Sequence, residues 1–175
     1  DNQDSDLPPN KGRLQMDATV ADQYITYPTD AKVLNSSRKE CEKMIDKLYA
    51  FNGKKGTKPR TYRRKTDTDF LDYSKKKSKS KVIHRKMNRK LLECVKRNLN
   101  HIDTLLDTYL CNNTKFPLNY EEQKMLWVIH TAYAQQKLMY DQKIQSVQDR
   151  IVNIFQPHVR PIPRGKIKSK IEFGS

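Results

Sequence analysis

Residues 81–110, KVIHRKMNRKLLECVKRNLNHIDTLLDTYL, decide the fold of this chain. Apolar residues recur in this stretch every three or four positions, which places them on one face of an α-helix. They are Ile83, Met87, Leu91, Val95, Leu99, Ile102, Leu106 and Tyr109. The spacing therefore predicts one long helix from Lys81 to about Leu110.

A second long helix is predicted after the chain breaks at Asn113, Thr114 and Pro117. Asn119 and Glu122 have the spacing of a capping box at its start. Apolar residues then recur every seven positions as the helix continues to Phe155. They are Leu126, Tyr133, Tyr140, Val147 and Ile154. Such a seam packs along a partner helix and belongs to the core, so we expect an antiparallel hairpin of two helices about 45 Å long.

A shorter helix is predicted from Asn35 to Asn52, with apolar residues at helical spacing. Ser37-x-x-Glu40 matches a capping box at its start, and Gly53 suits its end. Residues 54–80 mix Gly, Pro, Ser and Thr with many charges. We expect this stretch to be a basic arm that becomes ordered on contact with a partner, with Phe70, Leu71 and Tyr73 as the anchors of a short helix.

Short strands are predicted towards both ends. Apolar residues alternate with polar ones in residues 13–20, RLQMDATV, and again in residues 166–173, KIKSKIEF. Ile25–Asp30 is expected to be a loop that turns at Pro28, and three prolines hold the path after Phe155 extended.

The predicted organisation has four parts. Residues 1–12 form a linker or domain boundary, 13–30 a strand and loop, 31–155 a helical insertion with a basic arm at 54–90, and 156–175 a Pro-rich connection and an incomplete strand. The fold class is mainly α, with a hairpin of long helices and a shorter helix between short terminal strands.

Composition limits the function classes. The chain of 175 residues suits one domain, and no stretch approaches the roughly 20 apolar residues of a membrane span. Cys41, Cys94 and Cys111 are far apart and odd in number, which argues against a disulfide framework or a zinc knuckle. Only five glycines are present, and no G-x-x-x-x-G-K loop occurs, which argues against nucleotide hydrolysis. We expect a soluble, cytoplasmic protein that has no small-molecule substrate and does not enter a membrane.

Charge is concentrated between Lys54 and Lys90. This stretch holds 16 of the 35 Lys and Arg residues and only three aspartates, so it carries 13 of the formal +15 charge. Such a field attracts phosphate backbones through counterion release. Tyr62, Phe70 and Tyr73 lie between the cations and add stacking surface. The predicted DNA-binding residues are Lys58, Arg60, Arg63, Arg64, Lys65, Lys75, Lys76, Lys77, Lys79, Lys81, Arg85, Lys86, Arg89 and Lys90.

Candidate metal ligands are few. Asp17 lies in the first predicted strand, although most such aspartates end strands or form turns; Asp22 and Asp30 are weaker candidates. His84, His101, His130 and His158 are scattered, and we assign them to the surface or core.

Three segments together resemble one family. They are residues 12–40 with DATV and YPTD, residues 58–65 with KPRTYRRK, and residues 149–175 with QPHVRPI and EFG. They look like the bacterial insertion-sequence transposases of the DDE type, in a group with a long helical insertion in an RNase H-like domain. The resemblance covers nearly the whole chain and implies that the terminal strands belong to an RNase H-like α/β sheet.

The resemblance also implies a chemistry. The first catalytic carboxylate of the family maps onto Asp17, which would bind Mg²⁺ in the complete enzyme. The second Asp and the Glu of the family are expected beyond Ser175, so this chain is expected to be an inactive fragment. Two-metal phosphoryl transfer needs several carboxylates. The location implied is the bacterial nucleoid in the cytoplasm.

Two other hypotheses stay open. A non-catalytic helical adaptor would bind nucleic acid through the basic arm and recruit a partner helix through the heptad seam. A purely structural helical bundle would not bind nucleic acid. Exposed strand edges favour pairing of two copies, hence a homodimer.

Overall fold

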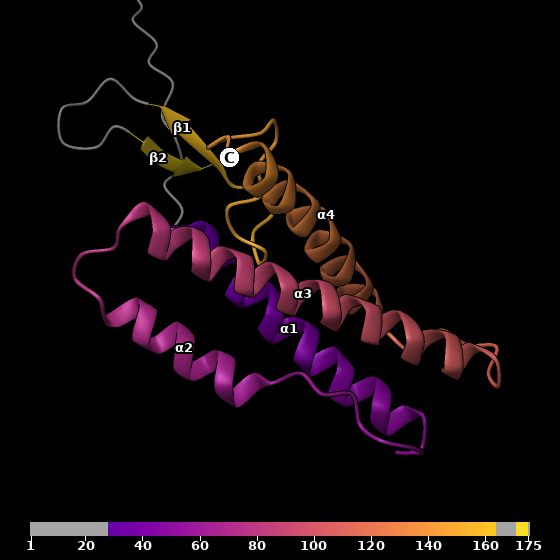
Figure 1. Ribbon diagram of the computed structural model, residues 1–175. Helices are drawn as coiled ribbons and strands as arrows, with labels where there is room; N and C mark the ends of the chain where they lie inside the picture. The colour runs from indigo at the N-terminus through magenta and orange to yellow at the C-terminus, as the bar shows by residue number, and fades with distance from the viewer. Residues whose placement is uncertain (1–27, 164–170, 175) are drawn as a thin grey trace, which may run out of the picture.

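The computed structural model describes residues 28–163 and 171–174. These residues form four helices and two short strands (Figure 1). The elements are α1 (Asp30–Phe51), α2 (Arg63–Lys75), α3 (Lys81–Leu110), α4 (Tyr120–Gln142), β1 (Arg160–Pro163) and β2 (Ile171–Gly174). The described part of the chain is therefore mainly helical, as predicted, and its helix from Lys81 to Leu110 has the predicted bounds.

The core lies between α1 and α3, which run side by side in the same direction, while α4 returns along them and α2 lies outside (Figure 1). The two central helices bring fully buried apolar side chains together because each has an apolar face. These side chains include Cys41, Ile45 and Leu48 of α1 and Leu91, Val95 and Ile102 of α3. The predicted antiparallel hairpin of α3 and α4 is present.

The start of α1 differs from the prediction. The helix begins at Asp30, and the Thr29 side chain accepts a hydrogen bond from the backbone N–H of Lys32. Ser37 is not a cap, because its buried hydroxyl donates to the carbonyl of Val33 one turn earlier. Thr29 caps the helix earlier, and the added turns bury Ala31, Val33 and Leu34. Its end before Gly53 (φ +67°) is as predicted.

The first half of α4 confirms the prediction. Asn119 and Glu122 form the capping box, and Leu126, Tyr133 and Tyr140 of the seam pack against the core. Glu122 also pairs with Lys47 of α1, which ties the start of α4 to the neighbouring helix.

The prediction for the second half of this helix is wrong. The helix ends at Gln142, where Lys143 takes a left-handed conformation (φ 57°), instead of continuing to Phe155. The chain then folds back, and the Gln135 side chain accepts from the backbone N–H of Ile151. Ile151 and Ile154 are buried against α1 and α4 in a second cluster. Ile154 belongs to the predicted heptad seam, yet it is buried without a helix.

β1 and β2 form an antiparallel pair in which Arg160 lies opposite Gly174 and Pro163 opposite Ile171. The strand predicted at 166–173 is described only from Ile171. β1 falls in the stretch that we predicted to be an extended connection, and the partner strand explains its regular form. The linker at 1–12, the strand at 13–20 and residues 25–27 lie outside the described residues. None of the described helices is long and apolar enough to cross a membrane.

Candidate nucleic-acid interface

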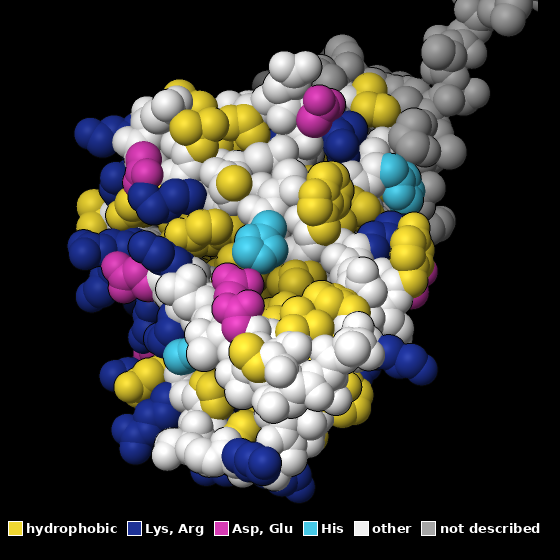
Figure 2. Space-filling model, turned by 90° about the vertical axis from the view of Figure 1, so that its right-hand side faces the viewer, with side chains coloured by type: hydrophobic (Ala, Val, Ile, Leu, Met, Phe, Trp, Pro, Cys, Tyr) yellow, Lys and Arg dark blue, Asp and Glu magenta, His cyan; other side chains and the backbone are white. Residues whose placement is uncertain are grey.

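The predicted DNA-binding residues follow the chain from the loop before α2, along α2, around the turn at 76–80 and into the first third of α3. Figure 1 shows this path as one edge of the molecule, with the turn at its tip. In Figure 2, Lys and Arg side chains gather along the side that faces the viewer in Figure 1, whereas the face seen directly carries mainly hydrophobic and uncharged side chains. The short helix expected around Phe70, Leu71 and Tyr73 is present as α2. Phe70 and Tyr73 pack against the core as expected, whereas Leu71 is exposed. Ordering of the arm on contact with a partner stays a prediction.

Four of the predicted cations are paired with carboxylates. Arg63 donates two hydrogen bonds to Asp46, at 2.8 and 2.9 Å, and Lys58 lies 2.8 Å from the same carboxylate. Arg89 pairs with Glu93 and Lys90 with Asp69. These charges are already compensated, so we do not assign them to contact with phosphates. The pairs of Lys58, Arg63 and Lys90 join α2 and the loop before it to α1 and α3. Arg89 and Glu93 both lie on α3.

Two more predicted cations bind backbone carbonyls. Lys79 donates to the carbonyls of Ser74 and Lys76 and lies over the Tyr73 ring. Arg85 donates to the carbonyl of Tyr140 at 3.1 Å and stacks on its ring at 4.1 Å from the centroid. Their charges are oriented but not neutralised.

The remaining eight predicted residues have no carboxylate partner among the residues that the structure describes, and all are exposed. We call them the unpaired cations. They are Arg60, Arg64, Lys65, Lys75, Lys76, Lys77, Lys81 and Lys86. Lys54 and Lys55 are also exposed and have no carboxylate partner within the described ranges. They were not among the predicted DNA-binding residues, although they lie in the same charge run.

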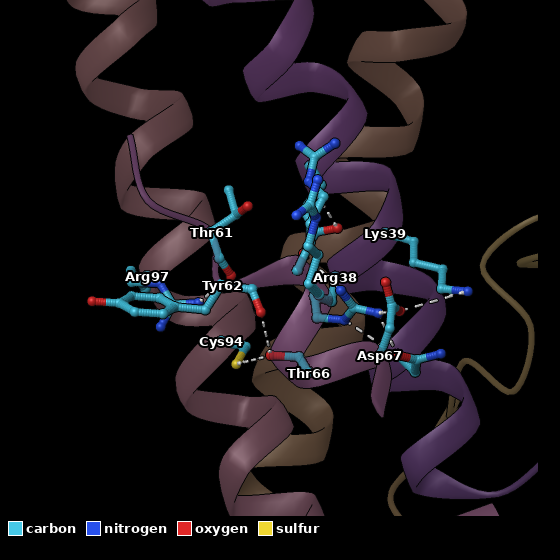
Figure 3. A network of polar contacts seen from close by, with 12 residues as sticks. Arg38, Lys39, Thr61, Tyr62, Thr66, Asp67, Cys94 and Arg97 are labelled. Carbon is cyan, nitrogen blue, oxygen red and sulfur yellow. Dashed lines mark hydrogen bonds and ion pairs between the residues drawn. The ribbon is translucent and has the colours of Figure 1, made fainter. Parts of the chain in front are cut away.

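A buried arginine holds α2 in place. Arg38 of α1 is fully buried and donates to Asn35, Glu42 and Asp67, the last of which belongs to α2 (Figure 3). A charge at this depth is stable only when it is paired and hydrogen-bonded. Because Thr66 and Tyr73 are the buried residues of α2, polar contacts carry much of its attachment. Arg38 was not among the predicted site residues, because an arginine within a helix is usually at the surface.

Two carboxylates of this network respond differently to their surroundings. Burial raises the pKa of Glu42, although Arg38 acts against it. Burial also acts on Asp46, but there the hydrogen bonds from Arg63 and Lys58 prevail and lower the pKa. Asp46 is therefore a firm anionic anchor for the loop and first turn of α2.

The three predicted stacking residues differ in their exposure. Tyr62 is 54% exposed and its ring lies under the Arg97 guanidinium, 4.9 Å from the centroid (Figure 3). Tyr73 is buried, and its hydroxyl lies 2.7 Å from Nδ1 of His84, while Phe70 packs against the core. Only the first of the three predicted rings is placed to meet a base. Tyr73 joins α2 to α3, and Phe70 joins α2 to the core.

The described residues do not bring a metal site together. No group of three or more His, Cys, Asp or Glu side chains that could hold a metal ion occurs within residues 28–163 and 171–174. Asp17 and Asp22 lie outside the described residues, and Asp30 pairs with Arg150. The described residues therefore do not supply the ligand set that the resemblance implies for Mg²⁺.

The three cysteines are free thiols. Cys41 is buried in the core, and burial raises the pKa of its thiol to about 12. Cys94 is buried beside Thr66, and Cys111 is exposed at the end of α3. Two of the thiols are therefore part of the packed interior, and the third is at the surface.

Comparison with protein-family models, with curated proteins and with solved structures finds no match for this chain.

Proposed function

We propose that this chain binds DNA through the basic surface of α2 and α3, as the helical part of a DDE-type transposase. The observation that supports DNA binding is the set of eight unpaired cations on one edge of the fold. Lysines that merely solubilise a helix are usually interspersed with acidic residues. Here the acidic residues nearby are mostly engaged by other cations.

The geometry suits a phosphate backbone. α2 has 13 residues, which at 1.5 Å per residue make it about 20 Å long. On each strand of B-DNA, phosphates follow one another every 3.4 Å along the helix axis. A helix of this length therefore passes several phosphates, and the lysines at its end extend the contact around the turn.

The enzymatic part of the proposal rests on the sequence resemblance. DATV and YPTD at one end and QPHVRPI and EFG at the other are the segments that support it. In this proposal the RNase H-like sheet contains the terminal strands, Asp17 is a ligand of Mg²⁺, and α2 and α3 position the ends of the DNA. The bacterial cytoplasm and a dimer on paired DNA ends belong to the same proposal.

The first prediction concerns the salt dependence of DNA binding. If about six of the eight unpaired cations contact phosphates, log K for a 30-bp duplex should fall with log [salt] with a slope of about −5. Fluorescence anisotropy between 50 and 300 mM NaCl measures this slope. A duplex affinity that is undetectable at 50 mM NaCl supports the structural bundle and refutes the proposal.

The second prediction separates a transposase from an adaptor. In the protein that contains this chain, Asp17→Ala should reduce cleavage of the element's ends in Mg²⁺ to background while DNA affinity stays within about twofold, because the change removes a metal ligand and no cation. Asp22→Ala is the matched control and should retain cleavage. Undiminished cleavage by the Asp17→Ala variant would contradict the proposal of a transposase.

The adaptor is the second candidate, and one observation favours it. Trp127 and Leu138, eleven positions apart and so on one face of α4, are 68% and 43% exposed. Exposed apolar side chains of this size are typical of contacts with other proteins. The heptad seam that we predicted for this role packs instead against the core.

A further inference from the structure

A cleft of about 510 Å³ opens beside the basic surface. It lies between the first turns of α1 and α3 and the end of α4 with the residues that follow it, and a smaller cavity that shares Asp30, His84 and Asn88 adjoins it. Its volume is within the range of about 300 to 1,000 Å³ typical of small-ligand sites. The described contacts of the fold do not fill it.

The floor of the cleft contains two amides whose hydrogen bonds are incomplete. Gln136 of α4 is 3% exposed, and its Nε2 has no partner among the described residues. Asn88 of α3 also lines the cleft, and its Oδ1 is buried without a partner in the described part of the chain. A buried polar group in this state costs about 1 to 3 kcal/mol. A ligand that carries both donors and acceptors would remove this cost.

The rim of the cleft is cationic. Lys81, Arg85 and Lys143 line it, while the carboxylate at its edge, Asp30, is engaged by Arg150. Lys81 lies in the first turn of α3, which has no acidic residue. The helix dipole there favours an anion. Arg85 is fixed by its contacts with Tyr140 and so is oriented before any ligand arrives.

Apolar side chains complete the walls, among them Leu92 and Met139. Apolar walls, two amides and a cationic rim match the three parts of a nucleotide: the faces of a base, its polar edge and its phosphate. Asn and Gln amides are common partners of base edges, particularly of adenine.

We infer that this cleft binds one unpaired nucleotide of a DNA strand, with the base edge at Asn88 and Gln136 and the phosphate at Lys81 and Arg85. The inference deepens the proposed DNA binding and rests on it, because the same two cations belong to the predicted DNA-binding residues. It adds recognition of a base to a surface that otherwise contacts phosphates.

The test compares three 30-bp duplexes: one fully paired, one with a single extra adenosine, and one with an abasic residue in place of that adenosine. We expect the chain to bind the duplex with the extra base about tenfold more tightly than the abasic duplex, since one base contact of this kind is worth a factor of this order. Equal affinity for these two duplexes overturns the inference.

Gln136→Met is the decisive variant. It keeps the length of the side chain and removes no hydrogen bond of Nε2 within the described fold, so a merely structural glutamine predicts unchanged or higher stability and unchanged binding. The inference predicts that the tenfold preference disappears while affinity for the paired duplex is unchanged. Gln148→Met, at an exposed position after α4 that does not line the cleft, is the control and should retain the preference.

A direct titration distinguishes this inference from the proposed function. Deoxyadenosine monophosphate and inorganic phosphate are titrated separately into the chain and followed by NMR. Tighter binding of the nucleotide, lost in Gln136→Met, supports the cleft even if duplex binding fails. Equal weak binding of both probes means that the cleft recognises phosphate alone and refutes it.

Discussion

A chain with Lys75, Lys76 and Lys77 changed to Gln should bind DNA about a hundredfold more weakly at 150 mM NaCl. All three lysines are exposed and have no carboxylate partner within the described ranges. Each phosphate contact contributes about 0.9 to the slope of log K against log [salt], so the loss of three contacts should reduce the magnitude of the slope by about 2.7. Anisotropy titrations across salt concentrations measure both values.

The matched control changes Lys58, Arg89 and Lys90 to Gln. This variant has the same net charge as the first, but its three cations are paired with Asp46, Glu93 and Asp69. We expect its affinity to stay within about threefold of the unchanged chain, since compensated charges release few counterions. If the two variants weaken binding equally, net charge alone governs it, and the assignment to the unpaired cations is wrong.

Arg38→Met should lower the free energy of unfolding by about 3 to 5 kcal/mol. The guanidinium is fully buried and binds Glu42, whose own side chain is 7% exposed. The substitution leaves this buried carboxylate with only the more distant Arg63, whose Nε lies 3.9 Å from Oε2. Asp67, which is half exposed, recovers water and contributes less. Urea unfolding measures the loss. Lys39→Met, at the adjacent exposed partner of Asp67, should change stability by less than about 1 kcal/mol.

Two further measurements identify the cause of that loss. The double variant with Arg38→Met and Glu42→Leu should recover most of it, because a well-packed apolar pair can replace a buried ion pair. The loss should also be smaller at pH 5 than at pH 8. Burial raises the pKa of Glu42 in the folded state, so protonation favours the folded chain, and this contribution is lost as the pH rises through the folded pKa. A loss that is independent of pH and of Glu42 would point to packing alone.

Local sequence predicted those parts of the fold in which one pattern had one structural solution. The apolar spacing of α3 continues over its whole length, so both of its bounds were predicted correctly. The Asn119–Glu122 box likewise determined the start of α4. The start of α1 was misplaced because Thr29 and Ser37 are both competent caps, and only the burial of Ala31, Val33 and Leu34 selects the earlier one.

The sequence by itself determined that this chain is mainly helical and that its positive charge is concentrated in 54–90, because periodicity and charge are properties of the order of residues. Tertiary structure decided the rest. It ended α4 at Gln142, since packing of Ile151 and Ile154 on α1 and α4 replaces the continued helix. It also divided the predicted DNA-binding residues into paired and unpaired cations, because their carboxylate partners lie on other turns and other helices, and a partner distant in sequence cannot be read from a local charge run.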